Sequence, residues 1–140
     1  MSELIHRVRV FPFSIERREP SYLLARREQG LESCWGPLQG EVGHGEQMEG
    51  AILRQVREGM GQEELIELID LKMPAHWLIG DEEIIEWNYG CRIHPLNAQD
   101  KPRPIRWESF AHAYPSLELK TDRAAILRLH ALLRLSLIHI

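Results

Sequence analysis

The stretch GEVGHGEQMEGAILRQVREGMG, from Gly40 to Gly61, carries the strongest pattern in this chain. Its first part is rich in glycine, which predicts a loop. From Glu46 to Met60 apolar residues recur at every fourth position, the spacing of one stripe of an amphipathic helix. Gly61 suits the end of that helix. The apolar residues are Met48, Ile52, Val56 and Met60, with Ala51 beside them.

Polar residues of the same helix define a candidate site. Residues three apart share a helix face, so Gln55 and Glu58 are expected together, beside the loop 40–45 and opposite the apolar stripe. Mg²⁺ held by a few carboxylates and by substrate phosphates is a common arrangement for attack on a phosphoanhydride. The stretch therefore indicates phosphate chemistry.

Strand and helix patterns flank the stretch on both sides. Strands are predicted at 6–15, 22–27, 65–73 and 83–93, with a short strand or turn at 105–110 and a surface loop at 97–104. Val8 and Val10 alternate with arginines, which is typical of a half-buried strand, and Pro12 predicts an edge or a bulge. Thr121 is predicted to cap a last helix that runs to about Leu135. This order predicts one α/β (or α+β) domain, with helices packed on a mixed sheet.

Composition excludes several classes of protein. The chain has 140 residues, 17 of them basic and 21 acidic, so it lacks the positive field that a nucleic-acid polymer requires. Its apolar runs are too short to span a membrane, and residues 1–15 lack the layout of a signal peptide. A cytoplasmic location follows as an expectation. Cys34 and Cys91 form no CxxC pair and are predicted to be free thiols.

The last residues, LSLIHI, are considered separately. They could continue the final helix, but they also resemble the translation of an adapter used in sequencing libraries. We therefore expect the domain to comprise residues 1–135 and treat 136–140 as a non-native tail.

The spacing of the opening stretch resembles the Nudix box, G-x5-E-x7-R-E-U-x-E-E-x-G-U, where U is a bulky apolar residue. Residues 22–46, YLLARREQGLESCWGPLQGEVGHGE, resemble the strand, Arg pair, Trp and glycine loop of that family, and 105–117, IRWESFAHAYPSL, resembles its late turn before the last helix. The chain is identified on these grounds as a member of the Nudix hydrolase family, most similar to the branch that hydrolyses dATP and dihydroneopterin triphosphate. The resemblance implies an α/β/α sandwich. The box positions that match are Gly40, Glu46, Arg54, Val56, Glu58 and Gly61.

The box is degenerate at several positions. Gln55 stands where the family has a glutamate that binds metal or activates water, and Gly59 stands in place of the second paired glutamate. Gln62 replaces the final apolar residue, and Gly43 replaces a frequent acid. A glutamine can orient water but cannot accept its proton. Losing a positioned base costs about 10²- to 10⁴-fold in rate, so activity is expected to be weak.

The resemblance implies roles for the remaining residues. Arg54 would pair with Glu46 to brace the loop, Glu58 would be the surviving metal ligand, and Gln55 would be a remnant that orients water. For the missing acid, the group Asp81, Glu82, Glu83 and Glu86 offers candidates, of which Glu83 and Glu86 are preferred as metal ligands; each is also read as a solvated surface acid, as are Glu41 and Glu49.

Substrate contacts are assigned in the same way. Arg26 and Arg27 could clamp a triphosphate or simply end a strand. Trp35 could stack on a base or belong to the core, as could Trp87 and Tyr89. Gly40 would approach the substrate from the loop. His44 could contact a phosphate or be an ordinary polar loop residue.

Two functions remain open. The first is a pyrophosphohydrolase dependent on weakly bound Mg²⁺ or Mn²⁺, which cleaves a nucleoside diphosphate linked to another moiety, such as a (deoxy)nucleoside or pterin triphosphate. The second is a catalytically inactive Nudix domain that binds a nucleotide-like ligand or a protein partner. In both cases the expected ligand is a small molecule, and a homodimer is left open.

Overall fold

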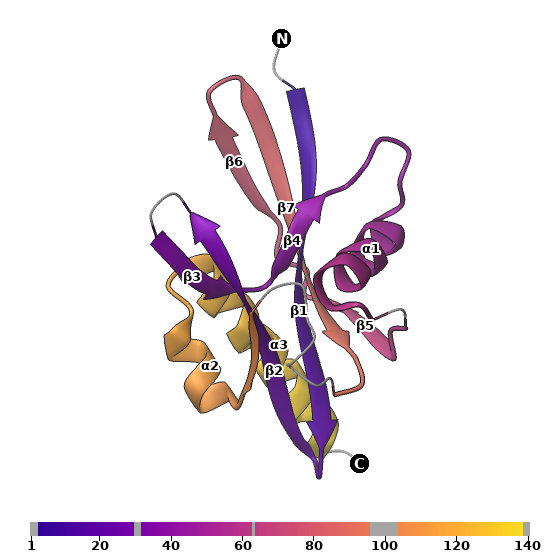
Figure 1. Ribbon diagram of the computed structural model, residues 1–140, viewed down its shortest axis with the longest axis vertical. Coiled ribbons are helices and arrows are strands. Elements are labelled where there is room, and N and C mark those ends of the chain that lie inside the picture. The colour runs from indigo at the N-terminus through magenta and orange to yellow at the C-terminus, as the bar shows by residue number, and fades with distance from the viewer. Residues whose placement is uncertain (1–2, 30–31, 63, 96–103, 139–140) are drawn as a thin grey trace.

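The computed structural model of the chain describes residues 3–29, 32–62, 64–95 and 104–138. In this part of the chain eight strands form one mixed sheet, with three helices packed on it (Figure 1). The strands are β1 (Glu3–Glu16), β2 (Glu19–Gln29), β3 (Glu32–Gly36), β4 (Leu38–Glu41), β5 (Glu67–Asp70), β6 (Ala75–Ile79), β7 (Glu82–Arg92) and β8 (Ile105–Glu108), and the helices are α1 (Met48–Met60), α2 (Phe110–Ser116) and α3 (Lys120–Ile138).

The sheet is centred on β1 and β7. Its main order is β3-β2-β1-β7-β5, while β4 pairs with β1, β6 with β7 and β8 with β2. Strands β1 and β7 run parallel from Glu3 opposite Glu82 to Phe13 opposite Arg92, and every other pairing is antiparallel. The predicted mixed sheet is confirmed.

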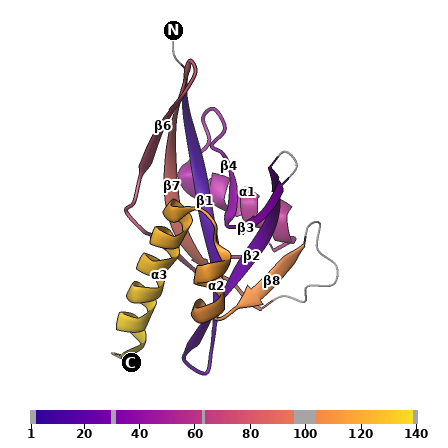
Figure 2. The same ribbon diagram turned by 90° about the vertical axis from the view of Figure 1, so that its left-hand side faces the viewer.

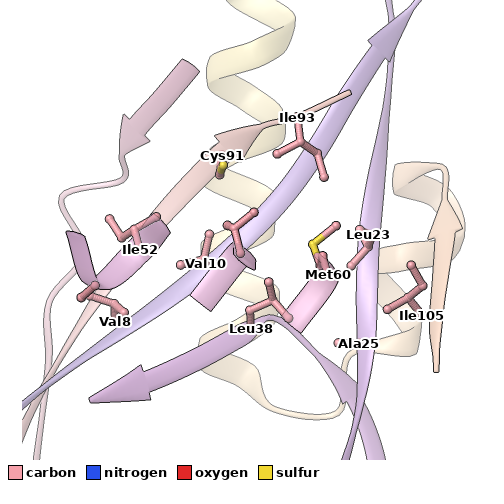
Figure 3. Close-up of a cluster of buried hydrophobic side chains, with 12 residues drawn as sticks. Val8, Val10, Leu23, Ala25, Leu38, Ile52, Met60, Cys91, Ile93 and Ile105 are labelled. Carbon is pink, nitrogen blue, oxygen red and sulfur yellow. The ribbon is translucent and has the colours of Figure 1, made fainter. Parts of the chain in front are cut away.

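Helices cover both faces of this sheet. Helix α1 lies on one face, while α2 and α3 lie on the other (Figures 1 and 2). The α1 face buries a cluster that includes Val8, Val10, Leu38, Ile52, Val56 and Met60, seen in part in Figure 3. The α3 face buries a second cluster that includes Phe11, Phe13, Ile126 and Leu129. The α/β/α sandwich is thus also confirmed.

Helix α1 follows its sequence pattern closely. Ala51, Ile52, Val56 and Met60 are buried, and Met48 packs against them. Gly61 ends the helix in the left-handed conformation, with φ of 70°, and its N–H donates to the carbonyl of Arg57. A side chain would strain that conformation, which explains the glycine.

The prediction that β1 buries only one face is wrong. Arg9 is 2% exposed, because its side chain points under α3, where it donates to Asp122. The carboxylate of Glu86 lies 3.8 Å from its Nε. Alternation of valine and arginine indicates a half-exposed strand only when no buried acid neutralises the arginine. The local sequence around Arg9 does not show that Asp122 and Glu86 are its partners.

Pro12 lies inside the sheet rather than at an edge. On one side β1 pairs with β4 through Arg7–Val10 and with β2 through Phe13–Glu16, and Pro12 falls between these two registers. A residue without an N–H is tolerated at such a change of partner.

Other boundaries differ from the prediction. Strands β3, β4 and β6 and helix α2 were not predicted, and Thr121 lies within α3 rather than at its cap. The predicted loop 97–104 falls almost wholly outside the described residues. Cys34 and Cys91 are buried free thiols, as predicted, and burial raises the pKa of Cys91 to about 12. None of the helices in the described ranges combines the length and apolar character needed to cross a bilayer.

Candidate active site

A brace between loop and helix organises the site. Arg54 in α1 donates two hydrogen bonds to Glu46, from Nε to Oε2 at 3.1 Å and from Nη2 to Oε1 at 3.0 Å. The same Nη2 donates to the carbonyl of Glu41 at 2.6 Å, and the N–H of Gly43 donates to Glu46 Oε1 at 2.8 Å. The loop is thereby fixed to the first turns of the helix, which is the pairing expected for Glu46 and Arg54.

The brace changes the acidity of Glu46. The hydrogen bonds from Arg54, followed by that from the Gly43 N–H, lower the pKa of Glu46 to about 2 from an ordinary value of 4.5. A carboxyl whose pKa is lowered by folding stabilises the fold above its ordinary pKa, and that contribution is lost as the pH falls from 4.5 towards 2.

Arg54→Met is expected to return the pKa of Glu46 towards 4.5, because the largest cause of the shift is then removed. An NMR titration of the Glu46 carboxyl measures this directly. Arg57→Met removes an exposed cation from the same helix and should leave that pKa where it is. An unchanged pKa in Arg54→Met would contradict the brace.

Gln55 and Glu58 lie near this brace. The side chain of Gln55 lies against Gly40, where a Cβ atom would come within 1.9 Å of its Nε2, so any larger residue at position 40 would require Gln55 to move. Glu58 is largely exposed, and its Oε2 lies 4.0 Å from Nη1 of Arg54. The two residues therefore face the loop side of α1, as their spacing requires, while their catalytic roles stay predictions.

The degenerate position Gly59 packs into the core. It is buried, and a Cβ atom there would lie 2.9 Å from Cδ2 of Leu38. Leu38 belongs to the buried cluster beneath α1. The space in which the box places a second carboxylate is therefore closed by a leucine.

The predicted metal ligands do not come together. Side chains alternate along β7, so Glu86 lies on the α3 face, opposite to α1 and Glu58. Glu86 is 6% exposed there. Its Oε2 lies 3.6 Å from Nη1 of Arg7, and its Oε1 accepts a hydrogen bond from Nε1 of Trp77 at 2.5 Å. Glu83 is held by His76, whose Nε2 lies 2.6 Å from its Oε1. Strand alternation thus turns Glu86 away from Glu58, and the metal-binding roles of Glu58, Glu83 and Glu86 stay predictions.

The described residues therefore provide few ligands for a divalent cation. Among the described residues, no three acids, histidines or cysteines are grouped so that they could hold a metal ion. The carboxylate of Glu58 and the amide oxygen of Gln55 are hard oxygen donors of the kind that Mg²⁺ prefers. They fit an ion that shares its coordination with substrate phosphates, rather than a preformed protein site.

The predicted substrate residues are divided between regions. Arg26 is exposed and pairs in register with Trp35, and Arg27 pairs with Cys34. Trp35 packs against the cluster under α3, with the guanidinium of Arg106 4.4 Å from its ring centre. Trp35 and Gly40 thus face opposite sides of the sheet, and Trp35 is better described as part of the core edge.

Two hollows border the strand β4. One of about 480 Å³ lies along the loop and is lined by Glu3–His6 and Glu41–Glu46. A smaller one of about 180 Å³ lies on the α3 face and is lined by Arg7, Arg9, Gln39, Trp77, Glu86, Leu119 and Thr121. Gln39 precedes Gly40 in β4, but the two hollows share no lining residue. Arg7 and Trp77 could not be selected from the sequence, since only the topology brings them to one place.

Comparison with solved structures identifies the fold. A protein of Listeria monocytogenes taken to be a Nudix hydrolase matches with a TM-score of 0.77 and 15% identity, over 94% of this chain and 95% of that one. The dihydroneopterin triphosphate pyrophosphohydrolase of E. coli matches with a TM-score of 0.71 and 18% identity, over 86% and 91%. The Nudix domain of Shewanella oneidensis NrtR, complexed with ADP ribose, matches with a TM-score of 0.75 and 14% identity, over 95% and 90%.

These matches show that the chain has the Nudix fold over most of its length. No protein-family model matches its sequence, and no curated protein does. At such low identity the likeness defines the fold, and the chemistry must be argued from the site.

Proposed function

We propose that this chain is a Nudix-type pyrophosphohydrolase of low activity, located in the cytoplasm. Its substrate would be a nucleoside diphosphate linked to another moiety, such as a (deoxy)nucleoside or pterin triphosphate. The single observation that supports the proposal is the brace from Arg54 to Glu46 and to the Glu41 carbonyl, because a loop fixed beside α1 would let Glu58 and Gln55 meet a diphosphate. ADP ribose, the ligand of the compared Shewanella domain, has this general chemistry.

The chain's own groups would supply orientation rather than proton transfer. Gln55 would accept a hydrogen bond from the attacking water through its amide oxygen, but it cannot take the proton. Gly40 leaves room for the Gln55 side chain. A Mg²⁺ or Mn²⁺ ion would be held by Glu58 and substrate phosphates, and would polarise the phosphoanhydride.

A second candidate is a domain that binds a nucleotide-like ligand or a protein partner without cleaving anything. Two observations favour it. Leu38 closes the space beside Gly59, and Gln55 occupies the place of a base. A fold can keep its ligand cleft after its chemistry is lost.

Release of pyrophosphate or phosphate from a panel of nucleotides, with Mg²⁺ or Mn²⁺, tests the proposal. We expect slow release from at least one nucleotide, and a loss of about 10²-fold or more in Glu58→Gln, since a charged group at the reacting centre is removed. Glu49→Gln neutralises an exposed acid on the same helix and should retain the activity. Calorimetry should show that Mg²⁺ alone binds more weakly than micromolar. No release from any nucleotide, together with nucleotide binding that survives in Glu58→Gln, would favour the second candidate.

A further inference from the structure

The outer edge of β6 is open and apolar. Strand β6 pairs with β7, and no other described strand pairs with it. Three successive side chains are exposed, Trp77 at 43%, Leu78 at 74% and Ile79 at 60%. Figures 1 and 2 show the β6–β7 hairpin projecting from the body of the domain beside the first residues of β1.

This edge lacks the features that normally prevent association. Edge strands usually carry lysine, proline, a bulge or an inward charge. The five residues of β6, AHWLI, include none of these. His76 is engaged by Glu83 of the neighbouring strand. Among the described strands only β7 pairs with β6, so its outward backbone groups can accept another strand.

We propose that β6 pairs antiparallel with β6 of a second copy of this chain, about a two-fold axis at Trp77. A two-fold contact must be self-complementary. Only a register centred on Trp77 pairs all five residues, with Ala75 opposite Ile79, His76 opposite Leu78, and Trp77 opposite its symmetry mate. Each large aliphatic side chain then meets a different neighbour, and the smallest residue faces Ile79.

Charges at the ends of the strand complement this register. Lys72 precedes β6, Asp81 follows it in the turn, Glu82 is the first residue of β7, and all three are exposed. In the antiparallel pair the Lys72 end of one copy approaches Asp81 and Glu82 of the other, and symmetry provides this contact twice. Opposite charges at the rim of an interface favour one orientation over its alternatives.

The same contact reaches the hollow on the α3 face. Trp77 lines that hollow beside Arg7, and its indole N–H donates to Glu86 at 2.5 Å. In the pair, Trp77 of the second copy lies against this indole. The second copy thus extends one wall of the hollow, whatever ligand the hollow binds.

Sedimentation velocity of the full chain, over a dilution series from micromolar to several hundred micromolar, tests the proposal. We expect a reversible dimer of the 16.3 kDa chain. Leu78→Lys replaces an exposed residue, so folding should be unchanged, but two buried cations would weaken association by about 100-fold or more. Leu127→Lys alters another exposed leucine, on α3 and 49% exposed, and should leave the dimer intact.

A charge exchange identifies the interface. Lys72→Glu should weaken the dimer by about 3- to 10-fold, and adding Glu82→Lys should restore it, in keeping with rim charge pairs. A wild-type chain that stays monomeric over the whole series would overturn the proposal and leave the edge to another partner. A dimer that is insensitive to Leu78→Lys would overturn it equally.

Discussion

Arg9→Met is expected to lower the free energy of unfolding by about 3–5 kcal/mol, the usual cost of breaking a buried ion pair. Arg9 is 2% exposed and lies between Asp122, at 1%, and Glu86, at 6%. Its removal leaves two interior carboxylates without their shared cation, whereas burying a methionine itself costs little. Urea denaturation followed by circular dichroism measures the change.

Two further variants make this result specific. Arg57→Met alters an exposed arginine of α1 and should change the stability by no more than about 0.5 kcal/mol. Arg9→Met combined with Asp122→Leu should recover most of the loss, because Glu86 keeps its contacts with Arg7 and Trp77. A cost below about 1 kcal/mol for Arg9→Met would mean that the cation is not the group that holds these acids in place.

Gln55→Glu is expected to raise metal-dependent pyrophosphohydrolase activity by about 10²-fold or more, in line with what one positioned base contributes. The substitution is close to isosteric, so the contact with Gly40 can be kept. Steady-state assays with the best nucleotide of the panel measure the gain. Gln62→Glu makes the same change just beyond the end of α1 and should give no gain.

The structure argues against combining this change with Gly59→Glu. The box alone predicts that both carboxylates restore the site, but a side chain at position 59 would press on Leu38 in the core and require it to shift. The single variant is therefore the cleaner test. If it folds and binds Mg²⁺ yet shows no gain, the cleft does not place a diphosphate for attack, and the binding domain becomes the better description.

Sequence predicted the parts of this protein that depend on near neighbours. The stripe of α1, its end at Gly61 and the pairing of Glu46 with Arg54 all lie within one local stretch, and each agrees with the structure. The strand containing Val8 and Val10 was located for the same reason.

What could not be predicted depends on contacts between distant residues. The burial of Arg9 requires Asp122, more than a hundred residues further along the chain. The orientation of Glu86 depends on which face of β7 meets α1, and no spacing within 81–86 reveals that. The packing of Gly59 on Leu38 requires β4 to lie beneath the helix. The fold was thus easier to predict than the composition of the site.

The parallel pairing of β1 with β7 also constrains how the chain can be made. Each pair in that register joins residues 79 positions apart, as Glu3 and Glu82 are. At a synthesis rate of about 5–20 residues per second, β7 follows β1 from the ribosome after roughly 4–16 s. During that interval β1 can pair with β2 and β4, which lie close to it in sequence. Its other edge has no partner until β7 has been made. We therefore expect a nascent chain in which the hydrophobic strand β1 needs protection until β7 has been translated.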